Sequence, residues 1–376
     1  MEISALRLGQ NLSQNINLYI YDQYPDYSNN DVLKANFPTA KILSISNSNL
    51  IRRIIWHINS FIKLIGFNFS FYDFINQVKL KYYVKKHSIN LINYHLFSFD
   101  TGFHWIKRFN DVKNVITIGC NYRDLIKDKG ISKLQSSIIR NLSCIDGITY
   151  KTDDGAYFTK ILPNYYFSNI KLKKIYNGIP ENLKIKELLN PFDDLGFIFG
   201  MVARGHKDKG WDIAIESFLD IKISKFNKVS LVLVGEGDYL GNLKDKYSYN
   251  NNIHFIGSCS YPIDLIQFFN VGLLPSKSEA FPNVLLEYML CSVPIIASNT
   301  GEIQKILTLN NNICGKIIDV HLNKSTVIQK FSSAMGSYLV SKSLYCKHKE
   351  NTHKTIKEFG LNKISKSYYD FYSEII

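Results

Sequence analysis

Residues 271–298 have the sequence VGLLPSKSEAFPNVLLEYMLCSVPIIAS, and this stretch decides the fold. It begins with an apolar run at 271–276 that is typical of a buried strand. Residues 282–291 then form an apolar-rich helical pattern, with Pro282 at the first helical position, which suits proline. A second apolar run at 293–298 predicts another strand. Because two strands joined by a helix form a parallel βαβ unit, the stretch predicts an α/β protein.

The same alternation of strands and helices extends along the whole chain of 376 residues, a length that fits two domains. Asn-Gly, Pro and a charged run at 173–194 indicate a turn and linker between them. We predict one parallel-sheet domain at 1–182 and another at 190–356. The other predicted strands are 16–22, 89–95, 114–120, 144–151, 195–203, 229–235 and 253–257. The other predicted helices are 1–15, 51–86, 101–109, 130–141, 210–220, 239–247, 261–269 and one or two within 352–376.

The charge balance points to phosphate-containing partners. The chain carries 45 Lys and Arg against 32 Asp and Glu, a formal net charge of +13. Such a surface attracts nucleic acid, anionic lipid or a diphosphate substrate, and charge alone does not distinguish them. No RNA-binding aromatic motif or DNA-reading helix signature is present, so we expect no nucleic-acid partner. Six scattered cysteines without metal-ligand spacing indicate reduced thiols and no bound metal.

We expect a cytoplasmic protein, since no apolar run of membrane-spanning length and no signal-peptide pattern is present. One segment has a pattern that is compatible with binding to a membrane surface. Residues 51–67, IRRIIWHINSFIKLIGF, place six isoleucines on one helical face, with Arg52, Arg53 and Lys63 largely off that face. This pattern fits a helix on the inner face of the plasma membrane, and it also fits an ordinary helix packed on the core, the commoner case.

Two glutamates flank the predicted helix entrance at Pro282. Glu279 lies in the loop after the predicted strand, and Glu287 lies about one turn inside the helix. Open α/β sheets bind ligands at the carboxyl ends of their strands, and a carboxylate can accept hydrogen bonds from two adjacent hydroxyls. We interpret the pair as a site for one polyhydroxyl ligand; the alternative is two solvated surface charges. The first helical amides, without intrahelical partners, would add donors: those of Asn283, Val284 and Leu285.

A second candidate site is GMVARGHKDKGWD at 200–212, where Arg204 and Lys209 lie between a predicted strand and a helix. Two cations in such a loop suit a diphosphate, and the alternative is a surface loop with incidental cations. The glycines of VGEGDYLG at 234–241 follow a strand, but their GxGxxxG spacing departs from the dinucleotide-binding motif. We interpret that segment as a tight turn.

His95, at the end of the predicted strand 89–95, is the most plausible catalytic or sugar-contacting histidine, and a packing histidine is the equal alternative. The sequence contains no HExxH, GxSxG, P-loop or D-x-D motif. The usual signatures of zinc proteases, serine hydrolases, NTPases and metal-dependent nucleotide-sugar enzymes are therefore missing.

Five segments together resemble glycosyltransferase family 4 in order and spacing: KKIYNGI, MVARGHKDKGWDIAIESF, LVLVGEGD, IHFIG and VGLLPSKSEAFPNVLLEYMLCSVPIIASNTGEI. The E-x7-E element, Glu279 to Glu287, is the most specific of these features. The resemblance implies a GT-B fold, in which two Rossmann-like domains face a cleft and a last helix, at about 357–376, crosses back to the first domain. It implies transfer of a sugar, of the hexosyl type, from a UDP- or GDP-sugar, with retained configuration and without a metal or other cofactor.

The resemblance also implies roles for single residues. Arg204 and Lys209 would hold the donor diphosphate, Glu287 would bind the ribose hydroxyls, and Glu279 would act on the donor sugar. The remaining donor contacts would be Gly257 beside the base and Phe281, Pro282, Asn283, Val284 and Leu285 beside the sugar.

Two departures from the family pattern lead to further expectations. The chain starts at MEISALRLGQNL, which resembles the helix after the family's first strand and glycine-rich loop, so we expect the first sheet to lack a strand. A late start codon or a truncated gene would explain this. The family's Thr-x-His is Thr117-Ile118-Gly119 here, so His95 or the Cys120-Asn121 loop would have to substitute for that histidine.

We therefore expect a glycosyltransferase of bacterial surface-polysaccharide biosynthesis, such as O-antigen or capsule. Its partners would be a nucleotide-sugar donor, a glycan or polyprenyl-diphosphate-linked acceptor and an anionic membrane surface. The alternative is a catalytically impaired sugar-nucleotide-binding or assembly protein of the same fold. The sequence leaves the donor sugar and the linkage open.

Overall fold

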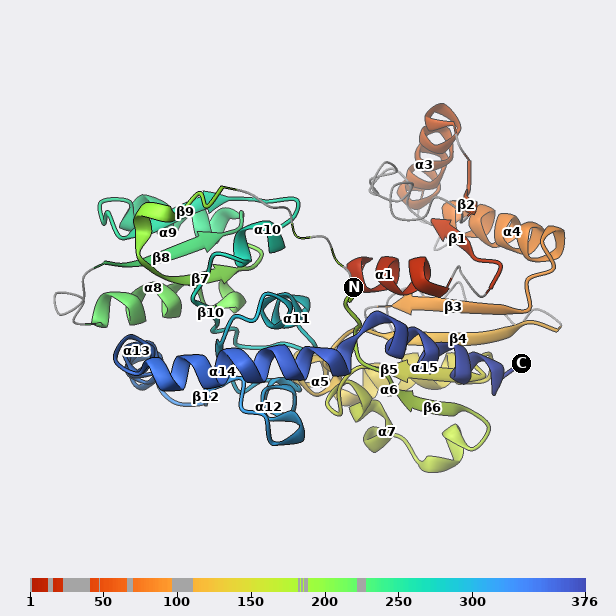
Figure 1. Ribbon diagram of the computed structural model, residues 1–376. Helices are drawn as coiled ribbons and strands as arrows, with labels where there is room; N and C mark the ends of the chain where they lie inside the picture. Colours follow the sequence, from red (N-terminus) through yellow and green to blue (C-terminus); the bar gives the residue numbers. More distant parts are fainter. Residues whose placement is uncertain are drawn as a thin grey trace. The chain divides into compact units, whose positions relative to one another are not determined.

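The computed structural model of the chain is shown in Figure 1. The structure describes residues 2–12, 16–22, 41–46, 48–65, 70–96, 111–181, 183, 185, 189–221 and 228–376. The chain divides into two compact units: unit 1 comprises residues 1–178 and 361–376, and unit 2 comprises residues 179–360.

Unit 2 contains one six-stranded parallel sheet with the strand order β12-β11-β10-β7-β8-β9. The strands are β7 (Phe197–Val202), β8 (Val229–Val234), β9 (Ile253–Gly257), β10 (Val271–Leu274), β11 (Ile295–Ser298) and β12 (Gly315–Ile318). The helices are α8 (Trp211–Asp220), α9 (Asp238–Tyr247), α10 (Ile263–Ile266), α11 (Asn283–Leu290), α12 (Ile303–Leu307), α13 (Lys324–Val340) and α14 (Lys342–Thr355).

Apolar side chains fill both faces of the unit 2 sheet. Trp211 of α8 and Phe331 of α13 are fully buried against Leu273 of β10 and its neighbours. Successive side chains of a strand point to opposite faces, so Gly272 faces the other way. A Cβ on Gly272 would lie 2.7 Å from the Tyr288 ring, which places α11 against that second face. Parallel sheets covered on both faces have such continuous apolar strands.

Unit 1 contains two parallel sheets, one with the order β3-β4-β5-β6 and one with β1 and β2. The strands are β1 (Tyr19–Asp22), β2 (Lys41–Ser44), β3 (Leu91–Leu96), β4 (Lys113–Ile118), β5 (Gly147–Tyr150) and β6 (Lys171–Lys174). The helices are α1 (Glu2–Leu12), α3 (Asn49–Leu64), α4 (Phe71–Lys86), α5 (Tyr122–Lys129), α6 (Ile131–Leu142), α7 (Phe158–Ile161) and the last helix, α15 (Leu361–Ser373).

The side chains of β4 show which helices cover each face of the four-stranded sheet. Ile116 and Ile118 are buried in a cluster with residues of α5 and α6, such as Ile138. Val115 points to the opposite face and packs with Leu8 of α1 and Phe371 of α15. The last helix therefore belongs to unit 1, where it lies beside α1.

The predicted α/β class with parallel sheets in two Rossmann-like units is confirmed. Two local predictions are wrong. Residues 173–174, the first of the predicted linker, belong to β6, and α11 begins at Asn283, with Pro282 preceding it. Strands β2 and β12 and helix α13 were not predicted. The predicted helix 101–109 lies outside the described residues.

Candidate functional site

The carboxyl edge of the unit 2 sheet has a topological switch point between β7 and β10. These strands are neighbours, while β8 and β9 follow on one side and β11 and β12 on the other. Open α/β sheets bind ligands at such a point, because the loops after the two strands diverge there. The loop 203–210 follows β7 and contains Arg204 and Lys209, and the loop 275–282 follows β10 and contains Glu279.

Lys209 and Glu279 form an ion pair across the switch point. The Lys209 Nζ donates to Glu279 Oε1 at 2.8 Å, and each side chain is 13% exposed. The two loops are also joined by their backbones, since the amide of Lys277 donates to the carbonyl of Asp208 at 2.8 Å. Both residues were predicted for the donor site, but this contact between them was not predicted.

Two glycines bring neighbouring loops close to the Glu279 segment. Gly210 has φ +75°, and a Cβ there would lie 2.1 Å from the Pro275 carbonyl oxygen. Gly301, after β11, has φ +55°, and a Cβ there would lie 2.3 Å from the Glu279 carbonyl oxygen. A side chain at either position would strain the backbone and displace the loop that holds Glu279.

The backbone of Arg204 is held by a hydrogen bond, whereas its side chain is exposed to solvent. Its carbonyl accepts a hydrogen bond from Nε1 of the fully buried Trp211 at 3.0 Å. The side chain is exposed, and within the described part of the chain its guanidinium has no ion pair or hydrogen bond. An exposed guanidinium of this kind can bind a phosphate group through two of its N–H donors.

The entrance of α11 differs in detail from the prediction. Pro282 occupies the N-cap in an extended conformation, and its carbonyl accepts a hydrogen bond from the Leu285 amide at 3.2 Å. That amide is therefore not available to a ligand, because it closes a tight first turn onto the carbonyl three residues before it. Phe281, Pro282 and Leu285 are buried, while Asn283, Val284 and Glu287 are partly exposed.

Three hydroxyls near the ends of β10 and β11 were missed by sequence analysis. Ser276 Oγ, Ser298 Oγ and Thr300 Oγ1 are buried and have no hydrogen-bond partner among the described residues. Buried polar groups in proteins are nearly always satisfied, so these hydroxyls point to a polar ligand or water at the same edge of the sheet. Their position at or just after the ends of two predicted strands was the one signal that could have identified them.

Gly257 lies at the end of β9, two strands from β7. This separation is about 10 Å at the usual strand spacing, so Gly257 lies at the margin of the switch point. It has φ +85°, and nothing lies within 4 Å of the position that a Cβ would take. The structure thus brings Lys209 and Glu279 into contact, places Arg204 in the same loop as Lys209, and sets Gly257 apart.

His95 lies in unit 1, at the carboxyl end of β3. Burial, followed by the nearby charge of Lys151, lowers its pKa to about 3, so its imidazole is neutral at physiological pH. Its Nδ1 is buried and has no hydrogen-bond partner among the described residues. His95 lines a cavity of about 890 Å³ within unit 1 and also a small cavity of about 10 Å³, which is room for one water molecule. The Lys151 side chain, on the same cavity, is 7% exposed, and burial lowers its pKa to about 8.

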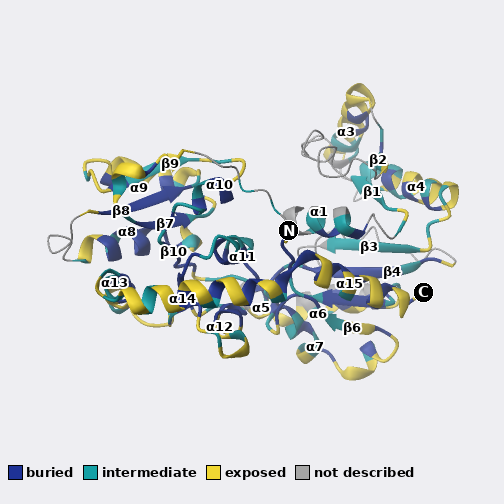
Figure 2. Ribbon diagram, viewed as in Figure 1, coloured by how far each residue is buried: buried dark blue, intermediate teal, exposed yellow. Residues whose placement is uncertain are grey.

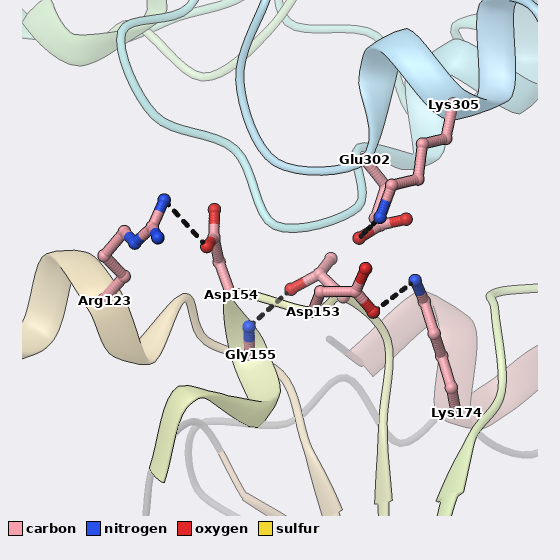
Figure 3. Close-up of polar contacts among 8 residues, drawn as sticks. Arg123, Asp153, Asp154, Gly155, Lys174, Glu302 and Lys305 are labelled. Atoms are coloured by element: carbon pink, nitrogen blue, oxygen red, sulfur yellow. Dashed lines mark hydrogen bonds and ion pairs between the residues drawn. The ribbon is translucent and has the colours of Figure 1, made fainter. Parts of the chain in front are cut away.

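Polar contacts gather at the carboxyl ends of β5 and β6 in unit 1 (Figure 3). Lys174 pairs with Asp153 at 2.8 Å, and Arg123 pairs with Asp154 at 3.3 Å. Figure 3 also shows the contact of Lys305 with Glu302 in unit 2, at 3.4 Å.

The second candidate for replacing the family histidine, the Cys120-Asn121 loop, is partly enclosed. Thr117 Oγ1 donates to Asn93 Oδ1 at 3.0 Å, and Cys120 is 4% exposed. Asn121 is partly exposed, and its Oδ1 accepts a hydrogen bond from the Arg123 amide at 3.1 Å.

No group of three His, Cys, Asp or Glu side chains within the described ranges is arranged to hold a metal ion. None of the described helices is long and apolar enough to cross a bilayer.

Comparisons with known proteins point in the same direction as the site. Residues 189–353 match the family model of glycosyl transferases group 1. The chain is 24% identical over 291 residues to the O-antigen biosynthesis glycosyltransferase WclY of Escherichia coli, which covers 67% of this chain and 80% of WclY. It is 33% identical over 137 residues to the capsular polysaccharide biosynthesis glycosyltransferase CapM of Staphylococcus aureus, covering 34% of each chain.

Solved structures share the fold over the whole chain. A glycosyltransferase from Rickettsia africae has a TM-score of 0.70 at 17% identity, covering 100% of this chain and 94% of its own. HepE of Anabaena, in complex with UDP-glucose, has a TM-score of 0.68 at 13% identity, covering 99% of this chain and 95% of its own. The fold is therefore that of GT-B glycosyltransferases, and the group 1 match includes every predicted donor-site residue of unit 2.

Proposed function

We propose that this protein transfers a sugar from a nucleoside-diphosphate sugar to a glycan or lipid-linked acceptor in the synthesis of a surface polysaccharide. The observation that carries the proposal is the Lys209–Glu279 pair, which lies at the switch point. Arg204 lies in the same loop as Lys209, and its guanidinium has no ion pair with any residue that the structure describes. Cations and a carboxylate at one sheet edge match a ligand with a diphosphate at one end and hydroxyls at the other.

The cations would act on the leaving group. Negative charge builds up on the diphosphate as the bond to the sugar breaks, and Arg204 and Lys209 would stabilise that charge. Glu279 holds the Lys209 ammonium in place and would accept hydrogen bonds from the donor sugar. Glu287, partly exposed in the second turn of α11, would bind the ribose hydroxyls, and the base would extend toward Gly257.

Configuration at the sugar would be retained, and no metal would be needed. We base this part on the resemblance of the E-x7-E segment, because such enzymes work without a dedicated nucleophile. The leaving phosphate would guide the acceptor to the same face of the sugar, so that positioning and electrostatics supply most of the rate. The partly buried setting of the ion pair strengthens such electrostatic effects.

The acceptor class is supported by the relatives, which are named for O-antigen and capsular polysaccharide synthesis. A lipid-linked acceptor would require contact with a membrane, and α3 offers a surface for it. Its exposed apolar side chains are 39–84% accessible: Leu50, Ile51, Ile54, Trp56, Ile58, Phe61 and Leu64. Ile55 is the one isoleucine of this helix that is buried, so the interpretation as an ordinary core-facing helix does not describe most of the isoleucine face.

Exposed cations accompany this apolar surface. Arg53 on α3 is exposed, as are four lysines of the adjoining α4: Lys79, Lys81, Lys85 and Lys86. Arg52 is an exception to the predicted pattern, since it is 6% exposed and donates to the Ser46 carbonyl at 2.7 Å. We propose peripheral binding of α3 to anionic lipid on the cytoplasmic side.

Vesicle sedimentation tests the membrane part. Vesicles with phosphatidylglycerol should retain the protein, and Ile54→Glu with Phe61→Glu should abolish retention. Val340→Glu is the matched control, because Val340 is an exposed apolar residue, 74% accessible, on α13 of unit 2. Equal retention of both variants, or none of the wild type, would reject membrane binding through α3.

A thermal-shift panel of UDP- and GDP-sugars tests donor binding, because a ligand of the folded state alone raises the melting temperature. Arg204→Ala should remove the shift, whereas Lys244→Ala, an exposed cation on α9, should keep it. Transfer to a lipid-linked glycan, with donor hydrolysis as a second readout, tests the reaction. Binding without either reaction would favour the sugar-nucleotide-binding or assembly protein, and no shift with any donor would contradict the proposal.

A further inference from the structure

A small cavity in unit 1 is lined by two buried nitrogen-bearing side chains that have no hydrogen-bond partner among the described residues. The cavity measures about 10 Å³, the room that one water molecule needs, and it lies at the carboxyl ends of β3, β4 and β5. His95 and Thr117 line it from β3 and β4, and Lys151 lines it from the position directly after β5. Figure 2 shows β4 as buried, next to β3. The cavity therefore lies in the interior of unit 1.

The proton on His95 can be assigned from its neighbours. The Asn93 side chain is fixed at both ends, because its Oδ1 accepts a hydrogen bond from Thr117 Oγ1 at 3.0 Å and its Nδ2 donates to Tyr372 Oη at 2.5 Å. The same Nδ2 lies 3.4 Å from His95 Nε2. Toward this amide Nε2 can only be an acceptor, so the neutral imidazole carries its proton on Nδ1. His95 Nδ1 is thus a buried donor, and no described residue accepts a hydrogen bond from it.

The Lys151 ammonium is the second buried donor. Its side chain is 7% exposed, and it forms no ion pair or hydrogen bond with any residue that the structure describes. Burial alone lowers the pKa of this lysine to about 8, so most of the ammonium is still charged at pH 7. Its charge also acts on the His95 imidazole, so the two groups are close neighbours. A buried charge without a partner is unfavourable, and an opposite charge beside it would stabilise the folded state.

The other walls of the cavity supply no negative charge. They come from α1, from residues 176–178 and from α15. Within the described part of the chain these walls contribute two titratable side chains, Tyr176 and Tyr368, whose phenols are neutral at physiological pH, and no Asp or Glu. Leu361 and Ile364 belong to the first turn of α15, a helix of 13 residues. The positive end of this helix therefore lies beside the cavity and favours an anion there.

We infer that this cavity binds one chloride ion, held by the Lys151 ammonium and by the Nδ1–H group of His95. Chloride accepts hydrogen bonds and donates none, which fits two donors that both lack an acceptor. It is only slightly larger than a water molecule, whereas a phosphate, a sulfate or a sugar is too large for this volume. A water molecule would also fill the space, but it would leave the charge of Lys151 unbalanced. We call the cavity the anion site.

The anion site can be reached from a larger space in the same unit. Leu8 and His95 line both the anion site and the cavity of about 890 Å³. An ion can therefore enter past these two side chains and need not cross the packed sheet. Once bound, it would join the end of β3 to the segment after β5. The inference rests on the two donors and on the cavity alone, so it does not depend on the proposed enzymatic function.

Hydrogen exchange of the full chain in sodium chloride and in sodium gluconate tests the inference. Gluconate gives the same ionic strength but is too large for the anion site. A ligand of the folded state stabilises it by RT ln(1 + [L]/Kd), so about 0.2 M chloride should slow exchange about tenfold if Kd is about 20 mM. The segments 91–96 and 147–151 of unit 1 should show this slowing, whereas β8 of unit 2, the internal control, should change much less.

Two variants separate the anion site from general salt effects. Lys151→Met should remove the chloride effect, because it deletes the charge and keeps the apolar volume of the side chain. Lys81→Met, at an exposed position on α4, is the matched control and should keep the full effect. In the wild type, chloride affinity should fall about tenfold per pH unit above pH 8, since the folded protein then loses the Lys151 proton.

Crystals of the wild type soaked in sodium bromide give a direct observation, which also decides the question if Lys151→Met does not fold. Bromide can replace chloride, and its anomalous scattering should give a peak between Lys151 Nζ and His95 Nδ1. Equal exchange in the two salts, or crystals without this peak, would mean that the cavity holds water and would overturn the inference. A chloride effect that persists in Lys151→Met would place the ion elsewhere and would also overturn it.

Discussion

Lys209 Nζ and Glu279 Oε1 lie 2.8 Å apart, although 70 residues separate them in the sequence. Each side chain is 13% exposed, so both charges have lost most of their contact with water. Lys209 also lies 3.5 Å from the exposed carboxylate of Asp208. The pair joins the two loops of the switch point, and its members were predicted to bind different parts of one donor, Lys209 the diphosphate and Glu279 the sugar.

Removing one member of this pair should destabilise the protein more than removing both. Lys209→Ala or Glu279→Ala leaves a partly buried charge without its partner, whereas the double variant leaves none. We expect a coupling free energy of about 1–2 kcal/mol from a double-mutant cycle measured by urea unfolding. The exposed pair Lys354–Glu350, at 2.6 Å on α14, is the control and should show a much smaller coupling. Equal coupling in both pairs would contradict a special role for burial.

The two glutamates of the α11 entrance should differ in their functional effects. Glu287→Ala should weaken nucleotide binding, seen as a smaller thermal shift with UDP or GDP alone. Glu279→Ala should mainly reduce transfer, by about 10²-fold or more, while free nucleotide still binds. Glu279→Gln helps to separate charge from shape, since its amide keeps an oxygen for the Lys209 ammonium. If both alanine variants match the wild type in an active preparation, the assignment of this segment fails.

The unit 2 strands from β7 to β11 could be predicted because their apolar runs are continuous. VSLVLV of β8 and its equivalents are recognisable without any tertiary information. β6 could not be predicted, because KLKK has three lysines in four residues. Its strand conformation comes from pairing with β5 at the edge of the sheet, where Lys171 lies opposite Gly147. Tertiary pairing overrides such local preferences.

The site shows the same division between local and long-range information. Loops after strands could be placed at one sheet edge from sequence, which is why Arg204, Lys209 and Glu279 were all named. The contact of Lys209 with Glu279 depends on β10 lying next to β7, and the order of strands in a sheet cannot be predicted from a local sequence pattern. The unsatisfied hydroxyls of Ser276 and Ser298 depend on burial and on side-chain geometry, which spacing does not reveal.

Tyr288 holds α11 against the switch point, and its hydroxyl should contribute to stability. The Val202 amide donates to Tyr288 Oη at 3.1 Å, and the same hydroxyl lies 3.3 Å from the carbonyl oxygens of Gly200 and Leu273. Tyr288→Phe leaves the Val202 amide without this partner, so we expect a loss of about 1–3 kcal/mol in the free energy of unfolding. Tyr249→Phe, at a 75% exposed position, should change it by less than about 0.5 kcal/mol. Similar losses in both variants would argue against the hydroxyl contact.

Lys151 should make unit 1 more stable in alkali than at neutral pH. Burial lowers the pKa of its ammonium to about 8, from the ordinary lysine value of 10.5 that applies in the unfolded chain. Below pH 8 the lysine is charged in both states, and the folded state bears the full cost of the buried charge. Between these two pKa values the folded lysine is neutral while the unfolded lysine still binds a proton, so the contribution to stability rises with pH.

The variant Lys151→Met removes the buried charge and keeps the apolar side-chain volume. It should stabilise unit 1 by as much as about 3 kcal/mol at pH 7, and the gain should shrink as the pH rises from 8 toward 10.5. Denaturant unfolding of both proteins at several pH values measures the difference, and Lys81→Met, at an exposed position of α4, is the control without a pH-dependent gain. A stabilisation that stays constant from pH 7 to pH 10 would mean that packing, and not the charge, determines the effect.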